Sequence, residues 1–451
     1  MAMDMERTVT MAINLPRRLP EAVAALIIVA TPLSVAAVET TGSVSAGVGV
    51  SDNLSRSTVK KNQTIRTLGL QFGAKENTRR LNLEVDSDLA YLDYPGSAYG
   101  GEIVGHLRGD ALLAVVPDRL NWMIRDVFGQ TRRSLYDPLT PNNRENVNFF
   151  STGPRVIIGL GDVANLLIAG TYTRNDHELR TLNSQQYGFD VGLERHLWAS
   201  STVSLHASHD HIVPDELAAV DPYDRESVYL NYSLAGADTL VKVNGGGTRV
   251  VLNGSTQTGP MVELEIQRRL GKRTQLFFTG GRQFTDEGAQ MGANYVARWA
   301  PTLDTASLAR TSESLRRTHA GSGLGMQGAH TSMVMDFTWN EDAFDSNPSL
   351  DRRRLTARSI VHRQVFSRLG ARAGGTWSTE SNVVSGVGVR ELSVNAGLDL
   401  RVTKNLFVDL DYDNYRTMPI ASSAASGSEN RVWLRLRYGM ARGMLGGSVT
   451  K

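Results

Sequence analysis

Apolar and polar residues alternate with a period of two over many stretches of this chain. In Leu392–Val402 every second residue is apolar, and the residues between them include Ser393, Asn395, Asp399 and Arg401. The same alternation recurs at 81–91, 262–267, 333–340 and 406–413. Because successive side chains of a β-strand point to opposite faces, this pattern predicts strands with one apolar face and one polar, often charged, face.

The alternating segments divide residues 42–440 into about 20 strands whose connections alternate in length. Short turns follow the even-numbered strands, and most connections after the odd-numbered strands are long. An even strand count with short turns at one end and long loops at the other is typical of transmembrane barrels. We therefore predict an all-β fold, a transmembrane up-and-down antiparallel β-barrel. A secreted solenoid, sandwich or propeller is the alternative, but the chain has no fixed-period repeat. The long connections are expected at 53–62, 131–147, 175–184, 211–223, 247–258, 286–316, 379–389 and 417–429.

The first residues have the features of a secretory signal peptide. Arg17 and Arg18 precede the apolar run Ala22–Ala30, and a small-residue cleavage site follows at Ser34–Ala37. The run is too short to span a bilayer, which needs about 20 apolar residues. We expect a cleaved signal peptide at 1–37, the barrel at 38–440 and a periplasmic tail at 441–451, in the outer membrane of a Gram-negative bacterium.

Composition and charge exclude several classes of function. The 48 Lys and Arg residues almost balance the 46 Asp and Glu residues, so the chain has no overall basic character for binding nucleic acid. The chain has no cysteine, which excludes a disulfide framework, thiolate metal sites and a cysteine nucleophile.

Sequence signatures of catalysis are weak. Gly323, Gly325 and Gly328 match a dinucleotide-binding spacing, but strand pattern follows where that motif needs a helix. A Ser–His–Asp hydrolase in the outer membrane stays open as a hypothesis, because a triad assembles in space, yet no local signature supports one. We predict no enzymatic activity, no catalytic residues and no cofactor.

A cluster of three histidines is the other candidate for chemistry. Alternation places His206 and Asp210 on one strand face and His209 and His211 on the other. The cluster is expected at a strand end that enters a long loop. We favour solvent-exposed histidines at the base of a loop over a metal site, so no metal ligands are assigned.

The polar strand faces are expected to line the lumen. Arg or Lys facing lipid at mid-depth costs about 2–4 kcal/mol, and Asp or Glu costs less, so charged residues should point inward. These charged strand faces indicate one of two interiors. The first is a pore that favours cations or admits sugars, and the second is a water-filled interior with structural ion pairs. The residues predicted to line the lumen are Glu84, Asp86, Asp88, Asp190, Glu194, Glu263, Glu265, Asp399, Arg401, Asp409 and Asp411.

Two long connections are candidates for a plug, because a barrel of this size must hold water or a plug in its interior. Thr131–Val147 is rich in turn-forming and charged residues, and Asn143, Arg144, Glu145 and Asn146 are its candidate plug residues. In 286–316, the Gly- and Pro-free stretch 303–316 is expected to form a helix. Ordinary surface loops are the alternative for both.

Several segments resemble one family of outer-membrane barrels. They are Ser51–Asn53, Asn121-Trp122, Asp126, Phe128–Gln130, Thr140–Asn148 and Ser151–Pro154. The family is described as PEP-CTERM system-associated and lies in exopolysaccharide loci of Gram-negative bacteria. The resemblance implies a role in exopolysaccharide biosynthesis or export, or in the sorting of surface proteins, and it implies no catalytic residues.

The sequence therefore leads to three hypotheses of function. The first is an exopolysaccharide-associated barrel that acts as a conduit, with outer-membrane lipid, polysaccharide and periplasmic export components as its partners. The second is a general or solute-specific porin. The third is a structural or adhesive surface barrel that uses its long loops.

Overall fold

The computed structural model describes residues 38–178, 182–215, 221–294, 313–344, 347–421 and 426–439. The predicted signal peptide and the predicted tail lie outside these residues. The strands are β1 (Glu39–Ser51), β2 (Gln63–Asn77), β3 (Leu81–Asp93), β4 (Glu102–Val116), β5 (Leu120–Arg132), β6 (Arg144–Gly159), β7 (Ala164–His177), β8 (Ser184–Trp198), β9 (Ser201–Pro214), β10 (Tyr223–Ala235), β11 (Thr239–Leu252), β12 (Ser255–Leu270), β13 (Thr274–Thr285), β14 (Leu315–Gln327), β15 (Thr331–Ala343), β16 (Arg352–Phe366), β17 (Leu369–Asn382), β18 (Gly388–Arg401), β19 (Leu406–Ile420) and β20 (Gly427–Gly439). The helices are η1 (Pro141–Asn143), α2 (Glu287–Asn294) and η3 (Pro348–Leu350).

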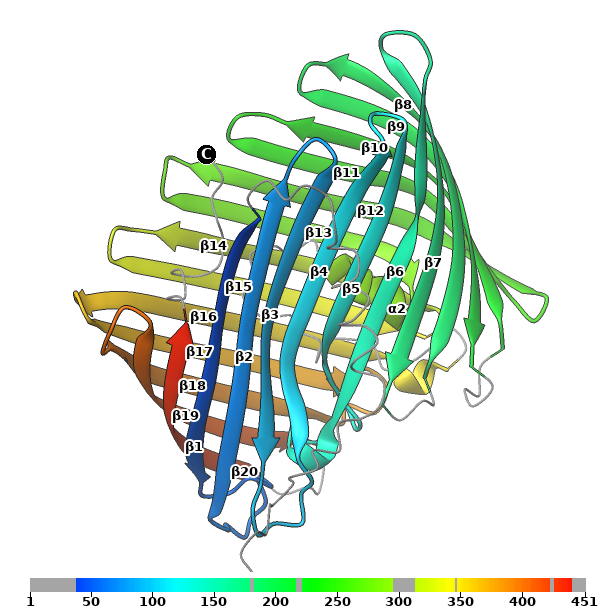
Figure 1. Ribbon diagram of the computed structural model, residues 1–451. Helices are drawn as coiled ribbons and strands as arrows, with labels where there is room; N and C mark the ends of the chain where they lie inside the picture. The colour runs from blue at the N-terminus through cyan, green and yellow to red at the C-terminus, as the bar shows by residue number, and fades with distance from the viewer. Residues whose placement is uncertain are drawn as a thin grey trace, which may run out of the picture. The chain divides into compact units, whose positions relative to one another are not determined.

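The strands form one 20-stranded antiparallel sheet in which each strand pairs with its neighbours in the chain (Figure 1). The first and last strands also pair, from Ser43 opposite Gly439 to Ser51 opposite Arg431. This pairing closes the sheet into a barrel without free edges, which satisfies the backbone hydrogen-bonding groups as a bilayer requires. The predicted antiparallel barrel is confirmed.

Long and short connections alternate as predicted, with one exception. Short turns follow the even-numbered strands, and the longer connections follow odd-numbered strands; we call these two ends of the barrel the turn side and the loop side. The long loop predicted at 247–258 is wrong. There β11 and β12 continue to a two-residue hairpin turn, Asn253-Gly254. Both residues have positive φ, of 50° and 76°, which is the conformation that Asn-Gly favours in a tight hairpin.

The outer face of the sheet is apolar. Residues opposite one another in an antiparallel ladder share a face, and Leu434 lies opposite both Leu410 and Val48. Large apolar residues that are exposed on this face include Val44, Val48, Leu68, Leu70, Phe189, Leu193, Leu205, Leu230, Phe337, Leu398, Leu410, Leu434 and Leu436. A closed barrel with such an exterior is stable in hydrocarbon, and the chain is an outer-membrane β-barrel. None of the described helices is long and apolar enough to cross a membrane.

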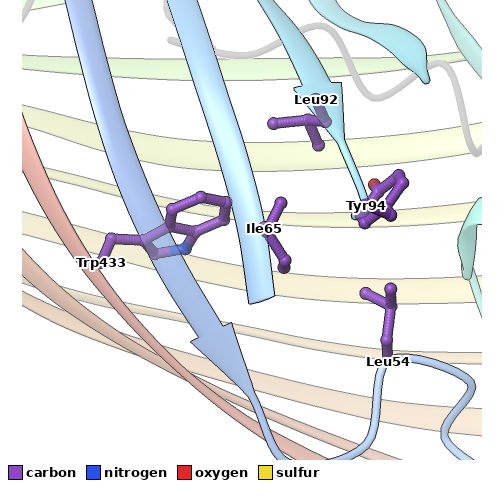
Figure 2. Close-up of a cluster of buried hydrophobic side chains, with 5 residues drawn as sticks. All are labelled: Leu54, Ile65, Leu92, Tyr94 and Trp433. Atoms are coloured by element: carbon purple, nitrogen blue, oxygen red, sulfur yellow. The ribbon is translucent and has the colours of Figure 1, made fainter. Parts of the chain in front are cut away.

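The clusters of buried apolar residues lie near the loop side, and they do not form one continuous core. One cluster joins Leu54 of the β1–β2 connection to Ile65, Leu92, Tyr94 and Trp433 (Figure 2). Because Trp433 belongs to β20 and Ile65 to β2, this cluster packs the connection against the inner wall where the barrel closes.

Candidate functional site

Charged residues line one face of the sheet, opposite the apolar outer face. In β19, Asp409 and Asp411 alternate with the exposed residues Leu410 and Tyr412. The same alternation places the remaining predicted residues on the inner face: Glu84, Asp86, Asp88, Asp190, Glu194, Glu263, Glu265, Asp399 and Arg401.

Most of these carboxylates have cationic or polar partners on the wall. Arg437 donates from Nε to Asp409 at 3.1 Å. Arg372 of β17 donates from Nε to Asp411 at 2.9 Å, although β18 lies between their strands, and Arg435 also contacts Asp411. The part of the wall near the turn side is therefore a polar surface with paired charges of both signs.

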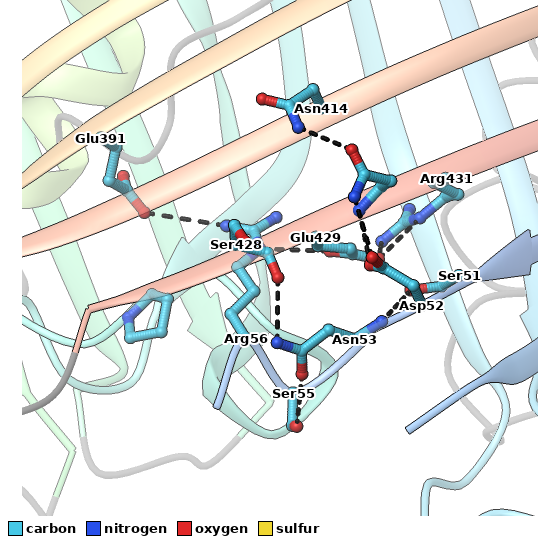
Figure 3. A network of polar contacts seen from close by, with 12 residues as sticks. Ser51, Asp52, Asn53, Ser55, Arg56, Glu391, Asn414, Ser428, Glu429 and Arg431 are labelled. Atoms are coloured by element: carbon cyan, nitrogen blue, oxygen red, sulfur yellow. Dashed lines mark hydrogen bonds and ion pairs between the residues drawn. The ribbon is translucent and has the colours of Figure 1, made fainter. Parts of the chain in front are cut away.

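The β1–β2 connection is fastened to the inner wall by a polar network (Figure 3). Arg56 donates from Nε to Glu429 of β20 at 3.2 Å, and its Nη1 lies 3.8 Å from Glu391 of β18. Its guanidinium also lies 4.3 Å from the centre of the Tyr415 ring. Ser51 donates to the second oxygen of Glu429 at 2.7 Å. Arg56 and Glu429 are both buried, so the network fixes this connection inside the barrel mouth.

The β5–β6 connection also reaches the far wall. Arg132, at the end of β5, forms an ion pair with Glu391 of β18, a strand that is not its neighbour. Within the connection, the Tyr136 side chain hydrogen-bonds to Asn382 at the end of β17, and burial raises the pKa of the Tyr136 phenol. Glu391 thus contacts Arg56 of the β1–β2 connection and Arg132 at the end of β5.

Asn143 gives this connection a defined shape. Its Nδ2 donates to the carbonyls of Ser134, Asp137 and Pro138 at 2.9–3.1 Å, and its Oδ1 accepts from the Ser134 amide at 2.6 Å. The connection is ordered around one buried amide, which the run of turn-forming residues did not reveal.

The other three candidate plug residues belong to the wall and not to the connection. Arg144, Glu145 and Asn146 are the first residues of β6, because the strand begins earlier than the sequence pattern indicated. Arg144 donates to Glu102 of β4 at 2.7 Å. Asn146 accepts from Gln130 of β5 at 3.2 Å.

A helix forms the third segment inside the mouth. Asp286 caps α2 by accepting from the Ala289 amide at 2.8 Å, and its second oxygen accepts from Arg225 of β10 at 2.7 Å. Met291 is fully buried against Val127, Val147 and Phe149 of β5 and β6. The helix therefore lies on the inner face of the wall (Figure 1).

A buried histidine between two carboxylates supports this helix. Glu287 Oε2 of α2 lies 3.1 Å from His177 Nε2, and Glu145 Oε1 lies 3.4 Å from His177 Nδ1. The three side chains are at most 1 % exposed. Of the helix predicted at 303–316, residues 303–312 lie outside the described residues, and Leu315 and Arg316 begin β14.

The opposite wall of the mouth holds a chain of buried ion pairs. Asp342 accepts from Arg317 at 2.6 Å and from Arg352 at 2.9 Å. Glu380 in turn accepts from Arg352 at 2.9 Å and from Arg354 at 3.0 Å. We call the β1–β2 connection, the β5–β6 connection, α2 and these ion pairs together the constriction. It holds fixed charges of both signs at the loop side of the lumen.

The three histidines of the cluster point to two different faces of the sheet. Among the described residues no group of three or more His, Asp and Glu side chains is arranged to hold a metal ion. All three histidines lie within β9 rather than in a loop. His209 and His211 are on the outer face near Asp224, whereas His206 faces the lumen, as the alternation predicted.

Comparison with known proteins gives only distant structural similarity. No family model and no curated protein matches the chain. The siderophore receptor PirA from Pseudomonas aeruginosa aligns over 90% of this chain and 81% of its own, with 11% identity and a TM-score of 0.40. The FrpB iron transporter from Neisseria meningitidis aligns over 89% and 81%, with 10% identity and a TM-score of 0.43. A mutant of the ferric enterobactin receptor (PfeA) from Pseudomonas aeruginosa aligns over 90% and 81%, with 10% identity and a TM-score of 0.44.

Proposed function

We propose that this barrel is a conduit for a hydroxyl-rich, saccharide-like solute, and that the constriction regulates passage. The observation that carries the proposal is the Arg132–Glu391 ion pair, which ties the end of β5, where the β5–β6 connection begins, to β18. A purely structural barrel would not need ordered connections fastened across its lumen.

The chemistry of the lumen supports a polar, uncharged or mixed-charge solute. Asp409 and Asp411 are neutralised by Arg437, Arg372 and Arg435, so the wall presents paired hydrogen-bonding groups rather than one strong charge. Paired carboxylates and guanidinium groups can exchange hydrogen bonds with sugar hydroxyls at modest cost. The resemblance to barrels of exopolysaccharide loci agrees with this solute class, and we extend the proposal to a role in exopolysaccharide export.

The proposal is tested in planar bilayers with the purified full-length protein. Deleting Ser134–Asn143 removes the connection and leaves β5 and β6 joined. Single-channel conductance should then rise, and a soluble oligosaccharide should produce transient blockades of the current. Equal conductance before and after the deletion would argue against the constriction, and a silent bilayer with both proteins would argue for a structural barrel.

A further inference from the structure

Three lumen-facing side chains of β8 and β9 form a continuous chain of hydrogen bonds. Asp190 Oδ1 lies 3.0 Å from His206 Nδ1, and His206 Nε2 lies 2.9 Å from the Ser204 hydroxyl oxygen. A carboxylate only accepts hydrogen bonds, so Nδ1 carries the ring proton and donates it to Asp190. In the neutral ring the other nitrogen carries no proton and accepts from the Ser204 hydroxyl. This is the bonding order of an acid, a base and a nucleophile.

The sheet holds these groups in place. Ser204 and His206 are two residues apart in β9 and therefore share the lumen face, and the adjacent β8 supplies Asp190. The His206 ring lies over Gly192, where a Cβ atom would come within 2.6 Å of Cε1. On its other side the ring stacks on Tyr229 of β10, with ring centres 5.0 Å apart and planes 5° from parallel. The imidazole is thus held on both faces and by both nitrogens.

Ser204 and His206 also open onto a cavity of about 340 Å³ in the lumen wall. Ile157 and Leu167 give the cavity an apolar side, although both lie on the polar face of the sheet. Asn231 and Asn244 line the polar side and are joined by an amide hydrogen bond of 2.5 Å. The cavity therefore brings apolar side chains, amide groups and the Glu194 carboxylate together around the serine hydroxyl.

We propose that Ser204, His206 and Asp190 form a hydrolytic site that removes short acyl groups esterified to a polyhydroxylated carrier. The acyl group fits the side formed by Ile157 and Leu167, and the carrier hydroxyls face Asn231 and Asn244. Arg155 lines the same cavity and supplies positive charge for the developing oxyanion. This activity goes beyond passage through the lumen and does not depend on it.

The reaction is an ordinary ester hydrolysis with water as the second substrate. The Ser204 oxygen attacks the ester carbonyl carbon while its proton moves to His206 Nε2, and Asp190 stabilises the resulting imidazolium. The carbon–oxygen bond to the carrier then breaks, and the carrier leaves as an alcohol with the proton from His206. Water attacks the acyl-serine and gives its proton to His206. The acid is released, and Ser204 recovers the proton.

The test uses the full-length barrel folded in detergent. A fluorophosphonate probe should label the wild-type protein at Ser204, and p-nitrophenyl acetate should be hydrolysed. Ser204→Ala and His206→Gln should each abolish labelling and hydrolysis. Asp190→Asn should lower the turnover rate by up to about 10⁴-fold, as an acid that orients the base does in known triads.

Ser227→Ala is the matched control. Ser227 lies on the neighbouring strand, and its hydroxyl hydrogen-bonds to Thr248 at 2.9 Å instead of to an imidazole. This variant should keep full labelling and hydrolysis. Heat-modifiable migration of each variant on gels shows whether the barrel is folded. A folded wild-type barrel that is neither labelled nor active, or equal labelling of Ser204→Ala, would overturn the proposal. Conductance is measured separately, so failure of this site leaves the conduit proposal standing.

Discussion

Arg132 at the end of β5 and Glu391 of β18 form an ion pair, although β19, β20, β1, β2, β3 and β4 lie between their strands in the sheet. Arg132 is buried, and the Glu391 side chain is 15 % exposed. The pair therefore joins two distant parts of the wall across the lumen. It also shares Glu391 with Arg56, so one carboxylate holds both the β1–β2 connection and the end of β5.

Replacing this carboxylate should open the constriction. Glu391→Gln leaves Arg132 buried without its charge partner, a change that typically costs about 3–5 kcal/mol when the pair is buried. We expect faster proteolysis of the β5–β6 connection in intact cells and a higher single-channel conductance. Arg353→Ala is the control, because its ion pair with Glu341 is exposed and such pairs contribute only about 0–1 kcal/mol. The same response from both variants would contradict the bridging role.

The buried ion pairs on the opposite wall should matter more for folding than for passage. Asp342 bonds to both Arg317 and Arg352, and its side chain is 2 % exposed. Asp342→Ala leaves two guanidinium groups without this partner, and we expect the free energy of unfolding to fall by about 3–5 kcal/mol. Denaturant titration in lipid vesicles measures this loss. Glu341→Ala, one position away on the outer face, should change the unfolding free energy by less than about 1 kcal/mol.

A glycine fixes how closely the β1–β2 connection approaches β20. A Cβ atom at Gly427 would lie 1.8 Å from the Arg56 carbonyl oxygen. Gly427→Ala must therefore displace backbone, and overpacking of this kind costs about 1–3 kcal/mol. We expect a lower thermal midpoint and weaker protection of the Arg56 region from protease. Gly245→Ala is the control, since a Cβ atom there meets nothing within 4 Å. A destabilisation of equal size in both variants would show that the contact is unimportant.

The topology makes a prediction about the two ends of the barrel. A short epitope inserted at Asn253-Gly254 or at Ser426 should bind antibody on intact cells, because both sites are on the loop side. The same epitope at Lys404-Asn405, in a turn-side connection, should bind only after the outer membrane is permeabilised. Antibody binding at Lys404-Asn405 in intact cells would show that the orientation is reversed.

Local patterns predicted the wall of the barrel but not its mouth. Each strand contains its own alternation of apolar and polar residues, as Leu392–Val402 does. The number of strands and the inward-facing charges could therefore be predicted from the sequence. The pair Arg132–Glu391 spans 259 positions, and no local pattern encodes it. The hairpin at Asn253-Gly254 had a known turn signal, but the glycines at 245–247 interrupt the alternation that would have extended β11.

The proposed hydrolytic site, too, could be predicted only in part from local sequence patterns. The spacing of Ser204 and His206 is visible in the sequence, and alternation already places both on the lumen face. Asp190 joins them only through the pairing of β8 with β9, in which Asp190 lies opposite Ser208. A one-residue shift of that register would turn the carboxylate to the lipid face, so the site depends on the register as much as on residue identity.

The last prediction concerns the effect of low pH on the end of β9, where the connection to β10 begins. Arg174 of β7 donates from Nη1 and Nη2 to the two oxygens of Asp215 at 2.9 and 2.8 Å. These hydrogen bonds hold the pKa of the Asp215 carboxyl below its ordinary value of 3.8. Because the folded-state pKa is depressed, the stabilisation is fully present above about pH 3.8 and is lost as the pH falls through the folded-state pKa.

Hydrogen exchange at the Asp215 amide, which donates to the Asn183 carbonyl at 2.9 Å, reports this loss directly. Its protection, normalised to the unfolded rate at each pH, should be constant from pH 7 to pH 5 and should fall below pH 3.8. Asp215→Asn removes the titrating group, so its protection should be lower at neutral pH and should no longer change in this range. Wild-type protection that stays constant down to pH 2 would mean that the Arg174 contact does not hold this end of β9, and that other contacts fix the connection.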